Sequence, residues 1–256
     1  MKTFDENRLL ELTKIMYEIQ QKWSDKNCKE TLRIHHREIE KLLQKTQVFA
    51  TWKSKVANKY KVAKELIPEI FMDAYISIPF ACMGLYKQAN VCLRAQLETA
   101  LRLVYFSTHP VEFKWWYEGS AWYLEAKSKD VWGIEYKYFR QLEEVKNFEK
   151  ASNFGLFDNI KNFYKVLSKY VHGGVASFQT SPNRISPKYI KGEFNKWVAN
   201  FRKVQKYVNT VLILGFSETF KASGADIQRK ILKVVENDKC KTGLRQSLGL
   251  RIRGRI

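Results

Sequence analysis

The stretch "NVCLRAQLETALRLVYFSTHP", residues 90–110, decides the fold class because its apolar residues recur at the spacing of an α-helix. One apolar face of this predicted helix contains Leu93, Leu97, Ala100, Leu101 and Val104. A second face contains Cys92, Ala95, Leu103 and Phe106. The helix is therefore expected to pack on two sides and to stop near Pro110.

A charged stripe lies between these two apolar faces. Arg94, Glu98 and Arg102 follow one another at intervals of four residues, so they stack along the helix. Flanked by apolar residues, the three side chains must satisfy one another. Two interpretations stay open: an ion-pair network that fixes helix packing, or a basic cleft in which Arg94 and Arg102 hold phosphate while Glu98 orients them.

Almost every other long segment has the same helical periodicity, and no segment shows a convincing strand pattern. We expect an all-α protein with a single multi-helix bundle of about eight to nine helices over residues 1–238. The expected helices include residues 28–66, as one or two helices running up to Pro68, then 69–84, 88–107, 191–221 and 224–237.

The last 18 residues, "KCKTGLRQSLGLRIRGRI" (239–256), are predicted to be a basic tail. They contain no acidic residue and six cations: Lys239, Lys241, Arg245, Arg251, Arg253 and Arg255. The tail is interpreted either as a flexible arm that binds nucleic-acid phosphates or as a solvated segment that aids solubility.

The formal net charge of +19 indicates a polyanionic partner, RNA or DNA first and an anionic membrane surface second. The N-terminal residues do not resemble a signal peptide, and no apolar run suits a transmembrane span, so a cytoplasmic location is expected. The four cysteines are scattered, and no HExxH, glycine-rich phosphate loop or GxSxG motif occurs. We therefore expect no disulfide framework, metal or cofactor.

Two histidines are candidates for catalysis. "NFYKVLSKYVHGG" (162–174) predicts an amphipathic helix in which His172 comes last and Gly173 follows as the helix stop. His172 is interpreted either as a cation favoured by the helix dipole or as a general acid/base at the mouth of a cleft. His109 ends the helix at 90–110, with six residues between it and Arg102.

Two segments, "GLYKQANVCLRAQLETALRLVYF" (84–106) and "FYKVLSKYVHGG" (163–174), resemble helices of the HEPN superfamily. The resemblance covers about residues 70–175. It implies a prokaryotic defence or toxin protein of the abortive-infection type, either a metal-independent RNase or an inactive RNA-binding or scaffolding relative. In the usual RNase motif, four to six residues lie between an arginine and its histidine; residues 165–167, at that spacing before His172, include no arginine.

The leading hypothesis is thus a nucleic-acid-binding HEPN-like protein of a defence or toxin module. Whether it is an enzyme stays open; as an RNase it would use His172 or His109 as acid/base and Arg94 and Arg102 for phosphate. The alternative is a non-catalytic adaptor that docks a partner protein or a nucleoprotein complex. Self-association also stays open, and a peripheral membrane protein is a third hypothesis.

Overall fold

The computed structural model describes residues 6–119, 134–172, 188–235 and 239–250, which are helical with short connections and contain no β-strand. The helices are α1 (Glu6–Ile19), the π-helical turn η1 (Gln20–Asp25), α2 (Lys26–Thr46), α3 (Val48–Val56), α4 (Lys61–Cys82), α5 (Tyr86–Thr108), α6 (Pro110–Tyr117), α8 (Ile134–Val145), α9 (Phe148–Ser152), α10 (Leu156–His172), α11 (Lys191–Gly215), α12 (Ser217–Lys221), α13 (Ala225–Val235) and α14 (Lys239–Ser247). The all-α prediction is confirmed.

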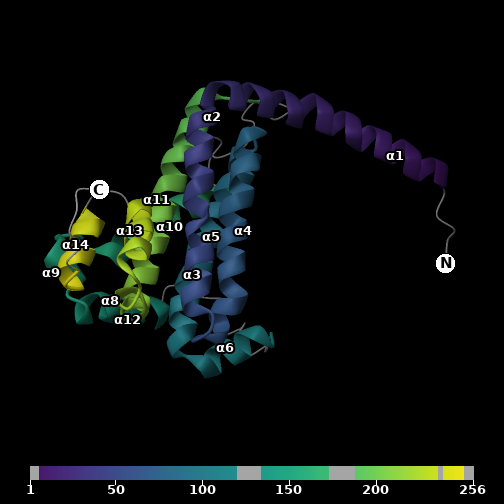
Figure 1. Cartoon of the computed structure of the whole chain (residues 1–256). Coiled ribbons are helices and arrows are strands. Elements are labelled where there is room, and N and C mark those ends of the chain that lie inside the picture. The colour runs from purple at the N-terminus through teal and green to yellow at the C-terminus, as the bar shows by residue number, and fades with distance from the viewer. Residues whose placement is uncertain (1–5, 120–133, 173–187, 236–238, 251–256) are drawn as a thin grey trace.

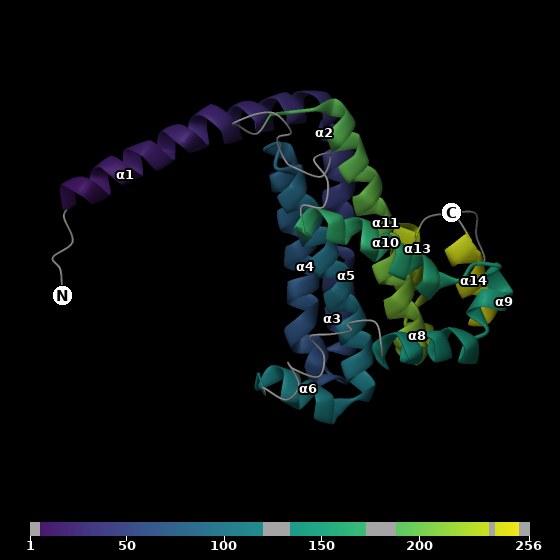
Figure 2. The same cartoon turned by 180° about the vertical axis from the view of Figure 1, so that it is seen from behind.

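The centre of the molecule is formed by long helices packed side by side. α5 packs against α4, α10 and α11, while α2 and α3 lie against α4 (Figure 1). The short helices α8, α9, α12, α13 and α14 gather beside α11, and α1 projects away from the other helices (Figure 1). Seen from behind, α10 lies against the α5 side of this arrangement (Figure 2). No helix in the described part of the chain is both long and apolar enough to cross a membrane.

The turn between α4 and α5 requires a glycine. Gly84 has φ +79°, and the Leu85 amide donates to the carbonyl of Phe80 at 2.8 Å while the Gly84 amide donates to Ala81 at 3.1 Å. This hydrogen-bond pattern is the Schellman motif, which ends a helix on a left-handed residue. A Cβ at Gly84 would also lie 2.7 Å from the Lys188 carbonyl oxygen, so the chain before α11 packs directly onto this turn.

The core contains large rings whose polar atoms are paired. Trp52 and Trp197 are fully buried, as are Tyr105 and Tyr207. Trp52 Nε1 donates to Asn209 Oδ1 at 3.0 Å, which ties α3 to α11. Trp197 Nε1 donates to Ser77 Oγ at 2.8 Å, which ties α11 to α4. Buried indole N–H groups need such partners, so these contacts fix how α11 lies on the first helices.

The structure has more helices than the eight to nine expected, because several predicted helices are divided. Residues 28–66 fall into α2, α3 and the first turn of α4, and residues 191–221 divide at Phe216, whose backbone is non-helical. Pro68, predicted as a helix boundary, instead lies inside α4. Burial of Leu66, Ile67 and Ile70 on either side of Pro68 favours a continuous helix over a break.

The first half of the predicted basic tail is a packed helix and not a flexible arm. In α14, Cys240, Gly243 and Leu244 are buried, and α14 lies against α9 and α11. The helix ends in a second Schellman motif, in which the Leu250 amide donates to the Arg245 carbonyl at 2.9 Å and Gly249 has φ +63°. The sequence signal was the apolar spacing of Cys240, Leu244 and Leu248, which the density of cations obscured.

Candidate functional site

The predicted charged stripe meets α10 in a polar cluster. Arg94 Nε donates to Ser168 Oγ at 3.2 Å, and Arg94 Nη2 lies 3.4 Å from Glu98 Oε1. Arg94 Nη2 also donates to the Tyr164 hydroxyl, which in turn donates to Glu98 Oε1 at 2.7 Å. We call these four residues the α5–α10 cluster. It joins the two helices on which the sequence analysis placed the candidate residues.

The α5–α10 cluster is half-buried, with side-chain exposures of 21% for Arg94 and 14% for Glu98. The Arg94 guanidinium also lies over the Tyr164 ring, 4.8 Å from its centroid. Burial, followed by the hydrogen bond to Glu98, raises the pKa of Tyr164 to about 12, so its hydroxyl remains a donor at neutral pH. The guanidinium is thus held in one orientation by a carboxylate, a phenol and an aromatic ring.

One nitrogen of this guanidinium is not used by the cluster. The hydrogen bonds of Arg94 come from Nε and Nη2, and Nη1 forms none with the described residues. An arginine fixed along one edge can present its remaining N–H groups to an anionic oxygen without loss of orientation. The cluster therefore supports helix packing and leaves the Nη1 hydrogens of Arg94 for a further acceptor.

Asp73 of α4 adds a titratable group next to α5 that the sequence analysis did not identify. Its carboxyl is half-buried, and burial followed by the charges of Glu69 and Glu98 raises its pKa to about 7. The charge of Asp73 in turn contributes to the raised pKa of Cys92, which burial mainly shifts to about 11. A carboxyl that titrates near neutral pH can act as a general acid or base.

Arg102 does not complete the stripe as expected. It is half-buried, and within the described ranges it forms no recorded ion pair with Glu98. The Glu98–Arg102 order is the better intrahelical pair, worth about 0.2–0.5 kcal/mol. The hydroxyl of Tyr164 bonds to the Glu98 oxygen that faces Arg94. A tertiary contact from α10 thus overrides the local preference.

His109 lies at the far end of α5 from Arg94. The two residues are fifteen positions apart, which corresponds to about 22 Å along a helix axis. The His109 ring stacks on Tyr105 with centroids 4.0 Å apart, and its Nδ1 lies 2.8 Å from the Tyr105 carbonyl oxygen. A carbonyl only accepts, so Nδ1 carries a proton and Nε2 holds the lone pair of the neutral ring. His109 and Arg94 therefore do not belong to one site.

The remaining predicted residues are only partly described. His172 is the last residue of α10, one turn after Ser168; its side chain lies outside the described part of the structure. Arg251, Arg253 and Arg255 also lie outside it. Arg245 is half-buried in α14, and its Nε is enclosed without a hydrogen-bond partner among the described residues. Arg245 is therefore part of a packed helix.

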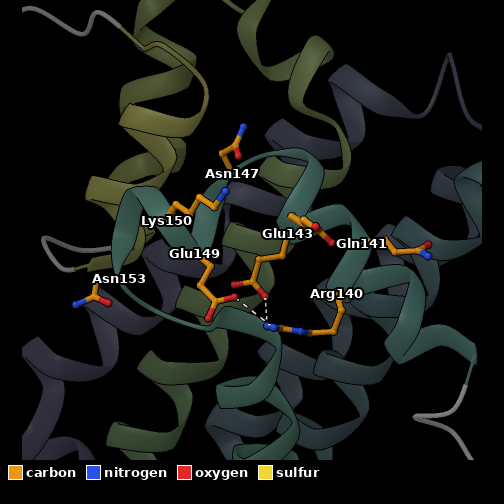
Figure 3. Close-up of a pocket in the computed structure, with 8 residues that line it drawn as sticks. Arg140, Gln141, Glu143, Asn147, Glu149, Lys150 and Asn153 are labelled. Carbon is orange, nitrogen blue, oxygen red and sulfur yellow. Dashed lines mark hydrogen bonds and ion pairs between the residues drawn. The ribbon is translucent and has the colours of Figure 1, made fainter.

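A charged hollow of about 700 Å³ is lined by residues of α8, of α9 and of the turns on either side of α9 (Figure 3). Arg140 Nη1 pairs with Glu143 at 3.0 Å and Asp158 at 3.5 Å, and its Nη2 pairs with Glu149 at 3.3 Å. Glu143 is 1% exposed and accepts from the Leu156 amide at 2.6 Å, at the start of α10. Arg140 is occupied by three carboxylates, so its contacts hold α8, α9 and α10 together.

The described residues contain no group of three or more His, Cys, Asp or Glu side chains arranged to hold a metal ion. Sequence reasoning found Arg94 and Glu98 but missed Tyr164, Ser168 and Asp73. Tyr164 stands at the apolar spacing of its helix, and Asp73 is a single charge within an apolar run, so neither is distinctive in the sequence. Their contacts depend on how α4, α5 and α10 pack, which periodicity does not specify.

Comparisons with known proteins give no relative. No protein-family model, no curated protein and no solved structure matches this chain.

Proposed function

We propose that this chain is a nucleic-acid-binding, HEPN-like helical-bundle protein of a prokaryotic defence or toxin module. The observation that carries the proposal is the α5–α10 cluster. The two helices that resemble HEPN proteins pack together, and their contact holds an arginine with Nη1 unpaired in the described ranges. The net charge of +19 supports a polyanionic ligand for such an arginine.

If the protein cleaves RNA, the geometry separates two arrangements. Arg94 of α5 bonds to Ser168 of α10, and His172 lies one turn after Ser168 on α10. Arg102 lies two turns before His109 on α5. The acid/base histidine would therefore work with the arginine on its own side, Arg94 with His172 or Arg102 with His109, and Glu98 would orient Arg94.

The test is cleavage of labelled RNA by purified protein with a chelator present. We expect RNA binding that weakens with salt, and we expect cleavage to be lost together in Arg94→Ala and His172→Ala, or together in Arg102→Ala and His109→Ala. Circular dichroism checks that each variant is folded. Cleavage that survives in all four variants removes these residues from the mechanism.

A non-catalytic adaptor is the second candidate. It is favoured by the fact that Arg94 already bonds to Glu98, Tyr164 and Ser168, as expected for an ion pair that fixes helix packing. The same assay separates the two functions: salt-sensitive binding without turnover supports the adaptor. Absence of any RNA or DNA binding contradicts the first function, and it contradicts nucleic acid as a ligand of the adaptor.

A further inference from the structure

A strongly basic hollow lies between α2, α11 and α13, away from every residue assigned above. Its volume is about 700 Å³, within the range of about 300–1,000 Å³ that ligand sites have. Five cations line it, and Glu38 is the only carboxylate among the described lining residues. The cations are Lys41, Lys45, Arg202, Lys230 and Lys233. We call this feature the basic hollow.

One of these cations, Arg202, contributes to packing. Arg202 Nη2 donates to both oxygens of Glu38 at 2.8 Å, and this pair ties α11 to α2. Lys230 and Lys233 are exposed on α13 and stand three residues apart, so their like charges share one helix face. Like charges on neighbouring turns of one helix face repel each other and destabilise the helix. Folding alone therefore does not explain why α13 presents two lysines to the hollow.

The lining also shows what kind of ligand would fit. Its described residues include no aromatic ring for base stacking, and its apolar members, Val48 and Val234, are buried. Recognition must therefore come from charge and from the amides of Gln44 and Gln47. Lysine ammonium groups bind phosphates as flexible point charges with no sequence preference. The cations come from three helices, so they can contact more than one phosphate of a chain.

We propose that the basic hollow binds the phosphate backbone of a nucleic-acid strand, independently of base sequence. The inference rests on the proposed function for its ligand class and adds the surface on which the strand lies. This surface does not include the α5–α10 cluster. In a strand that also contacted the α5–α10 cluster, the part on the basic hollow would be bound through its phosphates alone. Such contacts carry no sequence information.

The experiment uses the full chain and compares two lysine-pair variants. Lys230→Gln/Lys233→Gln removes the hollow's α13 lysines. Lys61→Gln/Lys64→Gln is the matched control, because Lys61 and Lys64 are also exposed, also three residues apart in a helix, and do not line the hollow. Anisotropy of fluorescein-labelled oligouridine and of a mixed-sequence RNA strand is measured across a salt series. Thermal unfolding of each variant is recorded in parallel.

We expect the α13 variant to bind both strands more weakly and to reduce the slope of log K against log salt by about 1.4, because each lost contact to a single strand removes about 0.7. Its melting temperature should be unchanged or slightly raised, since a like-charge pair is removed. The control variant should keep the wild-type slope.

An equal loss of strand binding in the two variants would overturn the basic hollow as a binding site, because binding would then depend on net charge alone. The proposed function would stand. Wild-type-like binding by the α13 variant would overturn the basic hollow in the same way. Failure of the wild-type chain to bind any strand would overturn the proposed function itself. Binding of inorganic tripolyphosphate in calorimetry, without binding of RNA or DNA, would overturn the nucleic-acid strand as the ligand.

Discussion

Arg94 of α5 and Ser168 of α10 face each other with Nε and Oγ 3.2 Å apart. The Ser168 hydroxyl donates its proton to the Tyr164 carbonyl at 2.9 Å, so its oxygen can only accept from Arg94. The direction of each hydrogen bond is thereby fixed, and α10 cannot rotate about its axis without breaking them. The α5–α10 contact is specified by polar groups as well as by apolar packing.

Removal of Arg94 should destabilise the protein by more than loss of an exposed ion pair does. Arg94→Ala leaves Glu98 half-buried without its cation, at a cost of about 1–3 kcal/mol. In a double-mutant cycle with Glu98→Ala, we expect a coupling energy of roughly 0.5–3 kcal/mol from urea unfolding. The same cycle on the exposed pair Lys221–Glu218 should give less than about 1 kcal/mol. If the losses in free energy of unfolding from Arg94→Ala and Glu98→Ala were additive, the interaction between the two residues would contribute nothing to stability.

Asp73 should make stability depend on pH in a defined direction. Its pKa is about 7 in the folded protein and 3.8 as the ordinary value, so the folded state binds the proton more tightly than the unfolded chain. The ionised carboxylate therefore lowers the free energy of unfolding. This penalty is fully present above pH 7 and disappears as the pH falls toward 4. Asp73→Asn should raise the free energy of unfolding at pH 8 by up to about 4 kcal/mol. The gain should shrink steadily in unfolding curves recorded down to pH 5.

Glu65→Gln is the matched control for Asp73→Asn, because Glu65 is also an acid of α4 but is exposed. Its effect should stay within about 0.5 kcal/mol at every pH. An Asp73→Asn gain that did not depend on pH would contradict the raised pKa.

The sequence predicted helices far better than it predicted their contacts. The helix around residues 88–107 is observed as α5, Tyr86–Thr108, because its periodicity is long and regular. The break at Phe216 was missed, since the residues on both sides of it are equally apolar. Pairing of Glu98 with Arg94 rather than Arg102 required Tyr164, which lies 66 residues away in the chain. Local rules describe one helix at a time, and the candidate site lies between two.

Glu143 should be the most sensitive carboxylate of the α8–α9–α10 junction. Glu143→Ala removes the acceptor for the buried Leu156 amide and one partner of Arg140, whose side chain is 36% exposed. A buried donor left without its acceptor costs about 1–3 kcal/mol, which corresponds to a fall in melting temperature of roughly 2–12 °C. Thermal unfolding followed by circular dichroism measures it. Glu144→Ala, an exposed neighbour on α8, should change stability by no more than about 0.5 kcal/mol.

Gly243→Ala tests whether α14 is a packed helix. A Cβ at this position would lie 2.5 Å from Ser152 Cβ and 2.9 Å from Phe148 Cε2 of α9. Overpacking of this kind costs about 1–3 kcal/mol. The undocked helix should also expose Lys241, which is 5% exposed in the structure, so trypsin should cleave there faster.

Gly192→Ala provides the comparison for Gly243→Ala. Gly192 is also helical, but a Cβ there would have no neighbour within 4 Å. Alanine should therefore leave stability unchanged or raise it by up to about 1 kcal/mol. Equal behaviour of the two alanine variants in melting and proteolysis would show that α14 is not docked.

The hydrogen bond from Trp52 to Asn209 joins residues 157 positions apart, and the ion pair of Glu38 with Arg202 joins residues 164 positions apart. Closing loops of this length costs entropy before any contact forms, which slows folding. Until α11 docks, α2 and α3 would display Trp52 and its apolar neighbours to solvent. Partly folded chains in which α11 has not docked are therefore the species most prone to aggregate. A substitution that slows docking of α11 should reduce soluble yield even when the native structure is unchanged.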